Sequence, residues 1–211
     1  MDYHAIDPVC YVYCSNFMKM FEIFKEYISS NITLSEEEWA KIKLVSIDKK
    51  LRKKEFLLRE GEIWKYCAFV GTGCLRTYRL DEEGYEHILE FSKERWWTGD
   101  VTSISTGKPS KYYIDAVEDT AVTLINTDDF DQLCIEIPKL GILMNNNLKQ
   151  CLGTNQGRVD IAISYNMEEK YRQFLTEFPE LSMRIPQYMI ASYIGITPES
   201  LSRLRKQLVR A

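Results

Sequence analysis

Residues 190–208 read IASYIGITPESLSRLRKQL, and this stretch decides the fold of the C-terminal part of the chain. Apolar residues recur at helical spacing on both sides of an interruption that contains Gly195, Thr197 and Pro198. Gly195 suits the left-handed residue that ends one helix, Thr197 can cap the next helix, and Pro198 fits its first turn. Two helices joined by a short turn with a glycine are typical of the helix-turn-helix. The pattern therefore predicts a helix-turn-helix in this stretch.

The second helix of this unit has two chemically different faces. Its inner face is apolar and is expected to pack on the first helix, whereas its outer face is predicted to enter the major groove of duplex DNA. Arg203 has the length and the forked guanidinium to bind guanine O6 and N7, and Glu199 can accept a hydrogen bond from cytosine N4. Arg205, Lys206 and Arg210 are expected to contact phosphates. The predicted DNA-binding residues are Thr197, Pro198, Glu199, Ser200, Arg203, Arg205, Lys206 and Arg210. A helical hairpin that only packs within the protein is the alternative.

The charge is divided unevenly along the chain. From Arg184 onward there are five cations and one anion, a net charge of +4, so the first 183 residues carry −8 of the total of −4. An acidic body with a basic end suggests that this end meets a polyanion, although a basic run can also be a solvated surface.

The length and composition are those of a folded protein with one large domain or two small ones. The first residues carry acidic groups and no basic region, and no long apolar run is present, so neither a signal peptide nor a membrane span is expected. The six cysteines are scattered, and Cys10 and Cys14 lack two further ligands at matching spacing, which favours reduced thiols over a metal site. These features predict a cytoplasmic protein. Met1, Met18 and Met20 are each possible starts.

Residues 45–130 predict an antiparallel barrel or jelly roll, because short apolar runs alternate with turns. LDEEGY (80–85) reads as a hairpin turn with Gly84 left-handed, and Tyr85, His87, Leu89 and Phe91 are expected on one face of the following strand. Two helices should precede this region, over residues 21–28 and from the N-cap Ser35, with Glu38 completing a capping box.

A further helical region is predicted from Asp128, with Pro138 near its first turns. Apolar and small residues then follow at steps of four and three, which makes a narrow stripe suited to pairing with a second copy of the same helix. A core helix inside a monomer is the alternative. The predicted dimer seam is Met144, Leu148, Cys151, Asn155, Val159 and Ala162.

From about Phe24 to the end, the chain resembles the Crp/Fnr family of bacterial transcription regulators. The resemblance lies in LLREGE (57–62), FVGTGCLRTY (69–78), WWTGD (96–100), KPSKYYIDAVEDTAVTLI (108–125) and above all ITPESLSRLRK (196–206). The combination is similar to family members from Bacteroidetes. It implies an α+β chain with an N-terminal extension (1–20), a β-roll (21–135), a dimerisation helix (136–164) and a helix-turn-helix domain (165–211). The family's usual two-stranded wing has no counterpart in the printed sequence after the recognition helix. The resemblance assigns base reading to Glu199 and Arg203.

The same resemblance implies an effector pocket in the roll. Gly99 and Asp100 occupy the place of the family's Gly-Glu pair, and Ser110, with Lys111 next, stands where the family has the Arg that binds a cyclic phosphate. Because a lysine lacks the fork of an arginine, the effector is not expected to be cyclic AMP. Thr154 and Asn155 take the family's adenine-side positions. No cofactor is certain, and a small-molecule effector is possible.

The sequence thus predicts a dimeric, sequence-specific DNA-binding regulator, and the resemblance implies RNA polymerase as a further partner. The main alternative is a small-molecule-binding module whose C-terminal head contacts a protein partner. An enzyme built on the roll is not expected, because the chain has only His4 and His87 as histidines and shows no HxH or CxxC spacing.

Overall fold

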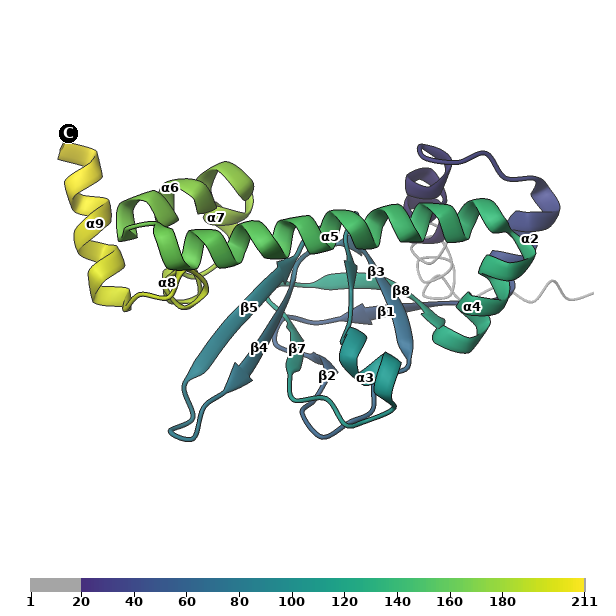
Figure 1. Ribbon diagram of the computed structural model, residues 1–211, viewed down its shortest axis with the longest axis horizontal. Coiled ribbons are helices and arrows are strands. Elements are labelled where there is room, and N and C mark those ends of the chain that lie inside the picture. Colours follow the sequence, from purple (N-terminus) through teal and green to yellow (C-terminus); the bar gives the residue numbers. More distant parts are fainter. Residues whose placement is uncertain (1–19, 211) are drawn as a thin grey trace, which may run out of the picture.

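Two four-stranded antiparallel sheets lie face to face below one long helix (Figure 1). The computed structural model describes residues 20–210, without the side chains of residues 209 and 210. Sheet A has the strand order β1-β8-β3-β6, and sheet B has the order β2-β7-β4-β5. The strands are β1 (Ser46–Leu51), β2 (Phe56–Leu58), β3 (Tyr66–Thr72), β4 (Leu75–Leu80), β5 (Glu86–Ser92), β6 (Trp97–Thr98), β7 (Tyr113–Ala116) and β8 (Thr120–Asn126). This arrangement confirms the predicted jelly roll, here called the roll.

The inner faces of the two sheets enclose an apolar core. Leu75 on β4, Ile114 on β7 and Val122 on β8 are completely buried there. Their neighbours along the same strands point to the opposite faces, as the alternation of side chains in a strand requires. The outer faces of both sheets therefore also carry large apolar side chains, and helices cover each of them.

The outer face of sheet A is covered by helices from both ends of the roll. These are the helix whose described part spans residues 20–29, α2 (Glu36–Val45) and α4 (Thr127–Glu136). The predicted capping box of α2 is confirmed, since Ser35 and Glu38 each accept a hydrogen bond from the other's backbone N–H. Trp97 belongs to this layer, because its ring packs against Phe24 and Phe69.

The β4–β5 hairpin has the predicted turn but not the predicted side-chain pattern. Gly84 has a φ of +86°, and Asp81 Oδ1 accepts the N–H groups of Glu83 and Tyr85. A bulge then shifts the register, so that Thr77 faces Glu90 while Tyr78 faces Ile88.

The expectation that Tyr85, His87, Leu89 and Phe91 share one face is therefore wrong. Phe91 is buried on the outer side of sheet B, whereas Leu89 lies against a cavity. The side chain of His87 is half exposed, and its Nε2 lies 2.7 Å from Asp81 Oδ2. The extra residue at the bulge breaks the period of two on which the prediction was based.

The long helix α5 (Pro138–Ser164) runs across the top of the roll (Figure 1). A single helical region from Asp128 was expected, but the structure has two helices, because α4 ends at Glu136 and Pro138 begins α5. Leu140 and Leu143 bury the start of α5 against the helices over sheet A. Between residues 148 and 164, only Arg158 and Ile161 are partly buried, and all the other residues are exposed to solvent.

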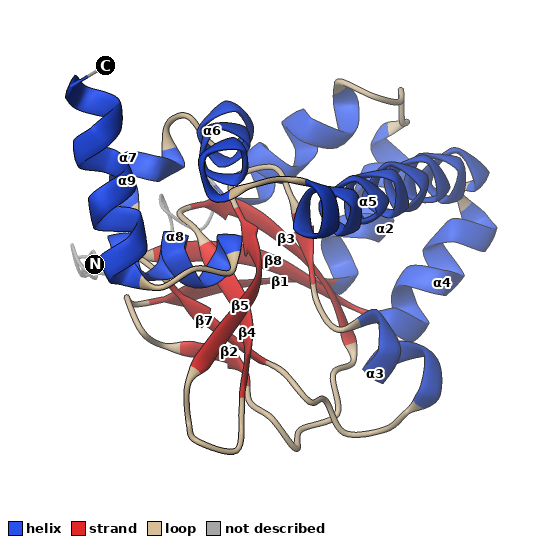
Figure 2. Cartoon of the chain, turned by 60° about the vertical axis from the view of Figure 1, so that its left-hand side comes forward, coloured by secondary structure: helices blue, strands red, loops and turns tan. Residues whose placement is uncertain are grey.

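The C-terminal helices form a compact unit, here called the head. It consists of α6 (Met167–Glu177), α7 (Leu181–Arg184), α8 (Gln187–Ile194) and α9 (Pro198–Arg210). Figure 2 shows the head beside sheet B, with α8 next to β5. The roll and the head share one apolar cluster. In it, the ring centroids of Phe91 and Tyr193 are 5.3 Å apart, and the Phe91 ring also packs against the rings of Phe174 and Phe178.

Polar contacts fix the same interface. Ser192 Oγ donates to Glu86 O at 2.7 Å and accepts from Ile88 N at 3.0 Å, so α8 is joined to the backbone of β5. Arg184 pairs with Glu94, at 2.6 Å, and with Glu118. Within the described residues, no helix combines the length and the apolar character that crossing a membrane requires.

Candidate nucleic-acid interface and ligand cavity

The turn between α8 and α9 depends on one left-handed residue. Gly195 has φ +74° and ψ +37°, and the N–H of Ile196 donates to Ala191 O at 2.9 Å. This is the hydrogen-bond pattern of a Schellman end, in which a left-handed residue closes the helix. A Cβ at Gly195 would meet no neighbouring atom, so the requirement for glycine is conformational and not steric.

Thr197 starts the second helix as predicted. Its Oγ1 accepts the backbone N–H of Ser200 at 3.2 Å, and its carbonyl accepts the N–H of Leu201 at 3.0 Å. Pro198 occupies the first position of α9, where no N–H is needed. The expected break and restart of the helix are therefore confirmed.

The two faces of α9 are separated as the sequence indicates. Leu201 and Leu204 are buried against α8, whereas Glu199 and Arg203 are exposed on the other side. Arg205 and Lys206 are exposed too, and Ser200 is half-buried, with its Oγ 3.3 Å from Arg203 Nη2. The side chain of Arg210 lies outside the described part of the chain.

Glu199 is set up to remain a carboxylate. Its own backbone N–H and the Thr197 hydroxyl donate hydrogen bonds that lower the pKa of Glu199, and the nearby charge of Arg203 lowers it further. The position in the first turn of α9 also favours a negative charge, because the N-terminus of a helix is partly positive. Glu199 can thus accept hydrogen bonds while Arg203 donates them.

One cation counted in the basic end is not available to DNA. Arg184 is held by Glu94 and Glu118 of the roll, which raise the pKa of its guanidinium. The cations on the exposed surface of α9 are therefore Arg203, Arg205 and Lys206 among the described side chains. The sequence could not separate these from Arg184, whose partners lie 90 and 66 residues away.

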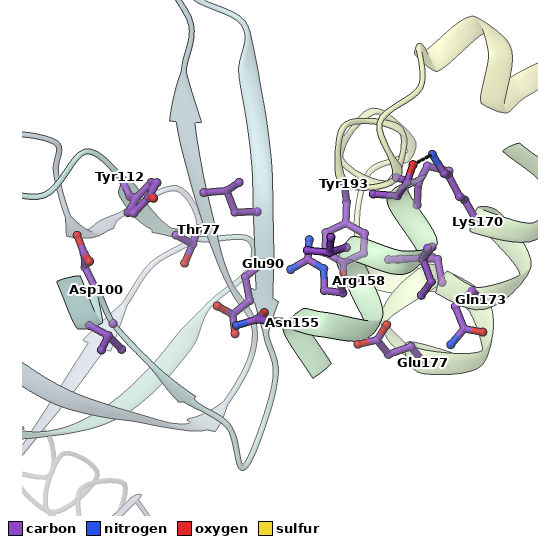
Figure 3. A pocket seen from close by; sticks show the side chains of 18 of the residues that line it. Thr77, Glu90, Asp100, Tyr112, Asn155, Arg158, Lys170, Gln173, Glu177 and Tyr193 are labelled. Atoms are coloured by element: carbon purple, nitrogen blue, oxygen red, sulfur yellow. Dashed lines mark hydrogen bonds between the residues drawn. The ribbon is translucent and has the colours of Figure 1, made fainter. Parts of the chain in front are cut away.

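A cavity of about 550 Å³ lies where roll, α5 and head meet. The roll contributes Glu90 and Asp100, α5 contributes Asn155 and Arg158, and the head contributes Tyr193, as Figure 3 shows. Its size is in the range of pockets that hold small molecules. No group of three or more His, Cys, Asp or Glu that could bind a metal ion occurs in residues 20–210.

Some of the predicted effector residues lie in this cavity. Gly99, Asp100 and Asn155 line it. Gly99 has a φ of +147°, and a Cβ there would lie 2.5 Å from the indole nitrogen of Trp64, so glycine is required. Asp100 caps the short helix α3 (Val101–Thr106), because its Oδ1 accepts the N–H groups of Thr102 and Ser103.

The other predicted effector residues have different places. The Ser110 hydroxyl accepts the N–H of Tyr112 at 3.0 Å within its own turn. Lys111 is exposed, and Thr154 Oγ1 donates to Gln150 O on α5. Ser110, Lys111 and Thr154 are not among the residues that line the cavity. Any role for them in ligand binding stays a prediction.

Sequence reasoning missed several polar residues of the cavity, among them Glu90, Arg158, Glu177 and Tyr193. Arg158 lies over the ring of Tyr193, with its guanidinium carbon 4.4 Å from the ring centroid. Burial raises the pKa of Glu90 and that of Glu177, while the charge of Arg158 opposes both increases. The signal in the sequence was a glutamate between the apolar residues Leu89 and Phe91, and the bulge concealed the direction of its side chain.

The stripe predicted as a dimer seam is open to solvent over most of its length. Leu148, Cys151, Asn155, Val159 and Ala162 are exposed, and Met144 is half-buried. A core helix within this chain is therefore wrong for this part of α5. The exposed apolar surface also includes Leu152 and Ile163, which the stripe omitted.

Comparison with known proteins agrees with this architecture. Residues 48–136 match the family model described as the cyclic nucleotide-binding domain. The chain is 25% identical over 192 residues to the anaerobic regulatory protein of Pasteurella multocida, which covers 83% of this chain and 68% of that protein. It is 26% identical over 190 residues to the fumarate and nitrate reduction regulatory protein of Vibrio cholerae, covering 82% and 73%. The chain is thus similar to proteins named as regulators, over most of its length.

Solved structures show the same fold. The structure of FixK2 from Bradyrhizobium japonicum matches with a TM-score of 0.69 at 21% identity, over 79% of this chain and 85% of that one. A protein described as a Crp/Fnr transcriptional regulator, from Eubacterium rectale, matches with a TM-score of 0.65 at 18% identity, over 84% and 85%. The relatives from Pasteurella multocida and Vibrio cholerae are named as regulatory proteins, in agreement with the expectation that the chain is not an enzyme.

Replacing Gly195 tests the turn of the helix-turn-helix. We expect Gly195→Ala to lower the free energy of unfolding by about 1 kcal/mol, because an L-residue with a Cβ is strained in the left-handed region. Gly195→Asn should lower the free energy of unfolding by less, because asparagine tolerates the left-handed conformation better. Urea denaturation of both variants measures the difference. Equal losses would contradict the conformational explanation.

Proposed function

We propose that the chain is a dimeric, sequence-specific DNA-binding regulator of transcription whose roll senses a small molecule. The observation that carries this proposal is the exposed outer face of α9, with Glu199 and Arg203 one turn apart beside further cations. A carboxylate and a guanidinium at the start of a recognition helix suit the donor and acceptor pattern of the major groove. The named relatives of this chain, which are regulators, support the same function.

The exposed apolar surface of α5 supports the proposed dimerisation through this helix. Leu148, Leu152 and Val159 recur at steps of four and seven, and each has half or more of its surface exposed. A row at this spacing suits a two-helix seam, in which the partner helix would remove these side chains from water. Two heads related by a two-fold axis would meet half-sites about 34 Å apart.

The cavity supports a role in regulation. It is bounded by the roll, by α5 and by the head, so a bound molecule would touch the proposed sensor, the proposed dimer helix and the bracing helix α8 together. A ligand that binds one arrangement of these parts more tightly shifts the population towards it. We infer that the effector is not cyclic AMP, because Ser110 and Lys111, at the place of the arginine that binds the phosphate in the family, do not line the cavity, and a lysine would lack the fork of that arginine.

Two finer features complete the proposal. The regulator would act with RNA polymerase, which is the usual partner implied by the resemblance to Crp/Fnr proteins. The sequences of its motifs also favour a Crp/Fnr regulator of the type found in Bacteroidetes. Both features rest on the resemblance described above.

Substitutions on α9 test DNA reading. A preferred site is first selected from randomised duplexes, and affinity is then measured by fluorescence anisotropy at several salt concentrations. We expect Arg203→Ala to lose about 1–3 kcal/mol on that site and to relax the preference at one base per half-site. Arg205→Ala should weaken all duplexes equally and reduce the salt slope by about 1.

Arg79→Ala, which removes an exposed cation from β4, is the control and should change neither quantity. A head that contacts a protein partner would show no base preference for Arg203→Ala to remove. That result would replace the DNA-binding proposal with the alternative.

A charge on α5 tests the dimer. We expect Leu152→Glu to convert the dimer to a monomer in sedimentation velocity, because it places like charges at the seam. Gln150→Glu adds the same charge two residues away, on the opposite side of the helix, and should leave the dimer intact. A dimer that tolerates Leu152→Glu would show that α5 does not form the seam.

A further inference from the structure

The charges that face the cavity are unequal. Three carboxylates line it, from Glu90, Asp100 and Glu177, against two cations, Arg158 and Lys170. Asp100 is engaged as the cap of α3, and Lys170 Nζ donates to Ala162 O at 2.9 Å. The cavity therefore has an excess of negative charge. Glu90 and Glu177 are the two carboxylates that do not cap a helix.

Glu90 is the carboxylate that most lacks a partner. It projects from β5 at the bulge, beside Asn155 and Arg158 in Figure 3. Among the described residues, none forms a hydrogen bond or an ion pair with its side chain. Burial without such a partner disfavours the charged form, and the pKa of Glu90 is accordingly raised.

Arg158 is not a direct partner of the Glu90 carboxylate. Its guanidinium stacks on Tyr193, and its charge acts on both Glu90 and Glu177 from a distance. Within the described residues it makes no ion pair with either carboxylate. One cation thus faces two carboxylates, and a phosphate placed near it would also lie near Glu90 and Glu177.

Much of the rest of the cavity wall is apolar or aromatic, beside polar residues such as Asn155 and Gln173. It includes Leu89, Val101, Val159, Ile161, Phe174, Tyr193 and Ile194. Such a wall suits the hydrocarbon or aromatic body of a ligand, while a few polar groups fix its orientation.

We propose that this cavity binds a small organic cation, with its protonated amine paired to the Glu90 carboxylate and its apolar body against the walls from α5 and the head. A charge-assisted hydrogen bond to a buried carboxylate is stronger than a neutral one. The inference rests on the proposed function, because it names the chemical class of the effector that the roll would sense.

Matched probes test the charge preference. Isothermal titration calorimetry on the full chain compares 2-phenylethylamine with 2-phenylethanol, which has a similar shape without the charge, and with 3-phenylpropanoate and cyclic AMP. We expect the amine to bind at least about tenfold more tightly than the alcohol. The anions should bind more weakly than either. An anion that binds as tightly as the amine, or failure of the amine to bind, would overturn the proposal.

Two variants locate the charge. Glu90→Gln keeps the shape of the side chain and should abolish the difference between the amine and the alcohol. Glu82→Gln removes an exposed carboxylate from the β4–β5 turn and should leave the difference unchanged. An amine preference that survives Glu90→Gln would assign the binding to another group.

A pH titration of the unmodified protein gives a second test that does not depend on a variant folding. The amine preference should be present at neutral pH and fall as Glu90 is protonated at lower pH, where the alcohol should bind as before. The titratable groups around the cavity, besides Glu90, are Asp100, Tyr112, Cys151, Arg158, Lys170, Glu177 and Tyr193. A preference that persists at pH values low enough to protonate every carboxylate would contradict the role of Glu90.

The outcomes separate this inference from the proposed function. DNA binding is measured without any probe, so a protein that reads DNA but prefers no amine would lose only the present inference. A protein that binds the amine through Glu90 but has no base preference would keep the ligand site and lose the regulator.

Discussion

The packing of the head on the outer face of sheet B is the interaction on which the rest of the structure depends. Phe91 is completely buried and contacts the rings of Phe174, Phe178 and Tyr193, so roll and head share one core. Ser192 joins α8 to the backbone of β5, and Arg184 joins the end of α7 to two carboxylates of the roll. The position of α8 and α9 is therefore set by sheet B of the roll.

This packing also creates the ligand cavity. β5 carries Phe91 on the side of the head, while Glu90, its neighbour, faces the cavity. Adjacent residues of a strand point to opposite faces, and the bulge at Leu89 lets both Ile88 and Phe91 pack in the cluster shared with the head. A molecule bound beside Glu90 would thus act one residue away from the contact that holds the head. Tyr193 contributes to both places, because its ring packs against Phe91 and lines the cavity.

Local signals made the helix-turn-helix predictable. Gly195, Thr197 and Pro198 act on backbone groups within a few residues, so their conformations follow from the sequence of the turn alone. The capping box of α2 and the hairpin at Gly84 are local in the same way. The alternation of short apolar runs and turns was sufficient for the jelly roll as a class. By contrast, the pairing of Arg184 with Glu94 joins residues far apart in the chain and leaves no local pattern.

The candidate sites were predictable to different degrees for the same reason. The exposed face of α9 follows from the helical period, which places Glu199 and Arg203 opposite Leu201 and Leu204. The cavity combines three parts of the chain, and only Gly99, Asp100 and Asn155 were anticipated there. Ser110 was expected in the cavity, but its hydroxyl instead satisfies the backbone of its own turn. Leu152 was missed on α5 because the chosen stripe was narrower than the apolar surface that the structure exposes.

Native-state hydrogen exchange tests the shared core most directly. If roll and head are one cooperative unit, the amides of β5 and α8 should exchange with the same free energy of opening, and Phe91→Ala should lower that free energy in both by about 3–5 kcal/mol. The account would be contradicted if the α8 amides exchanged through a low-energy opening that leaves β5 protected, and if Phe91→Ala did not change the free energy of that opening.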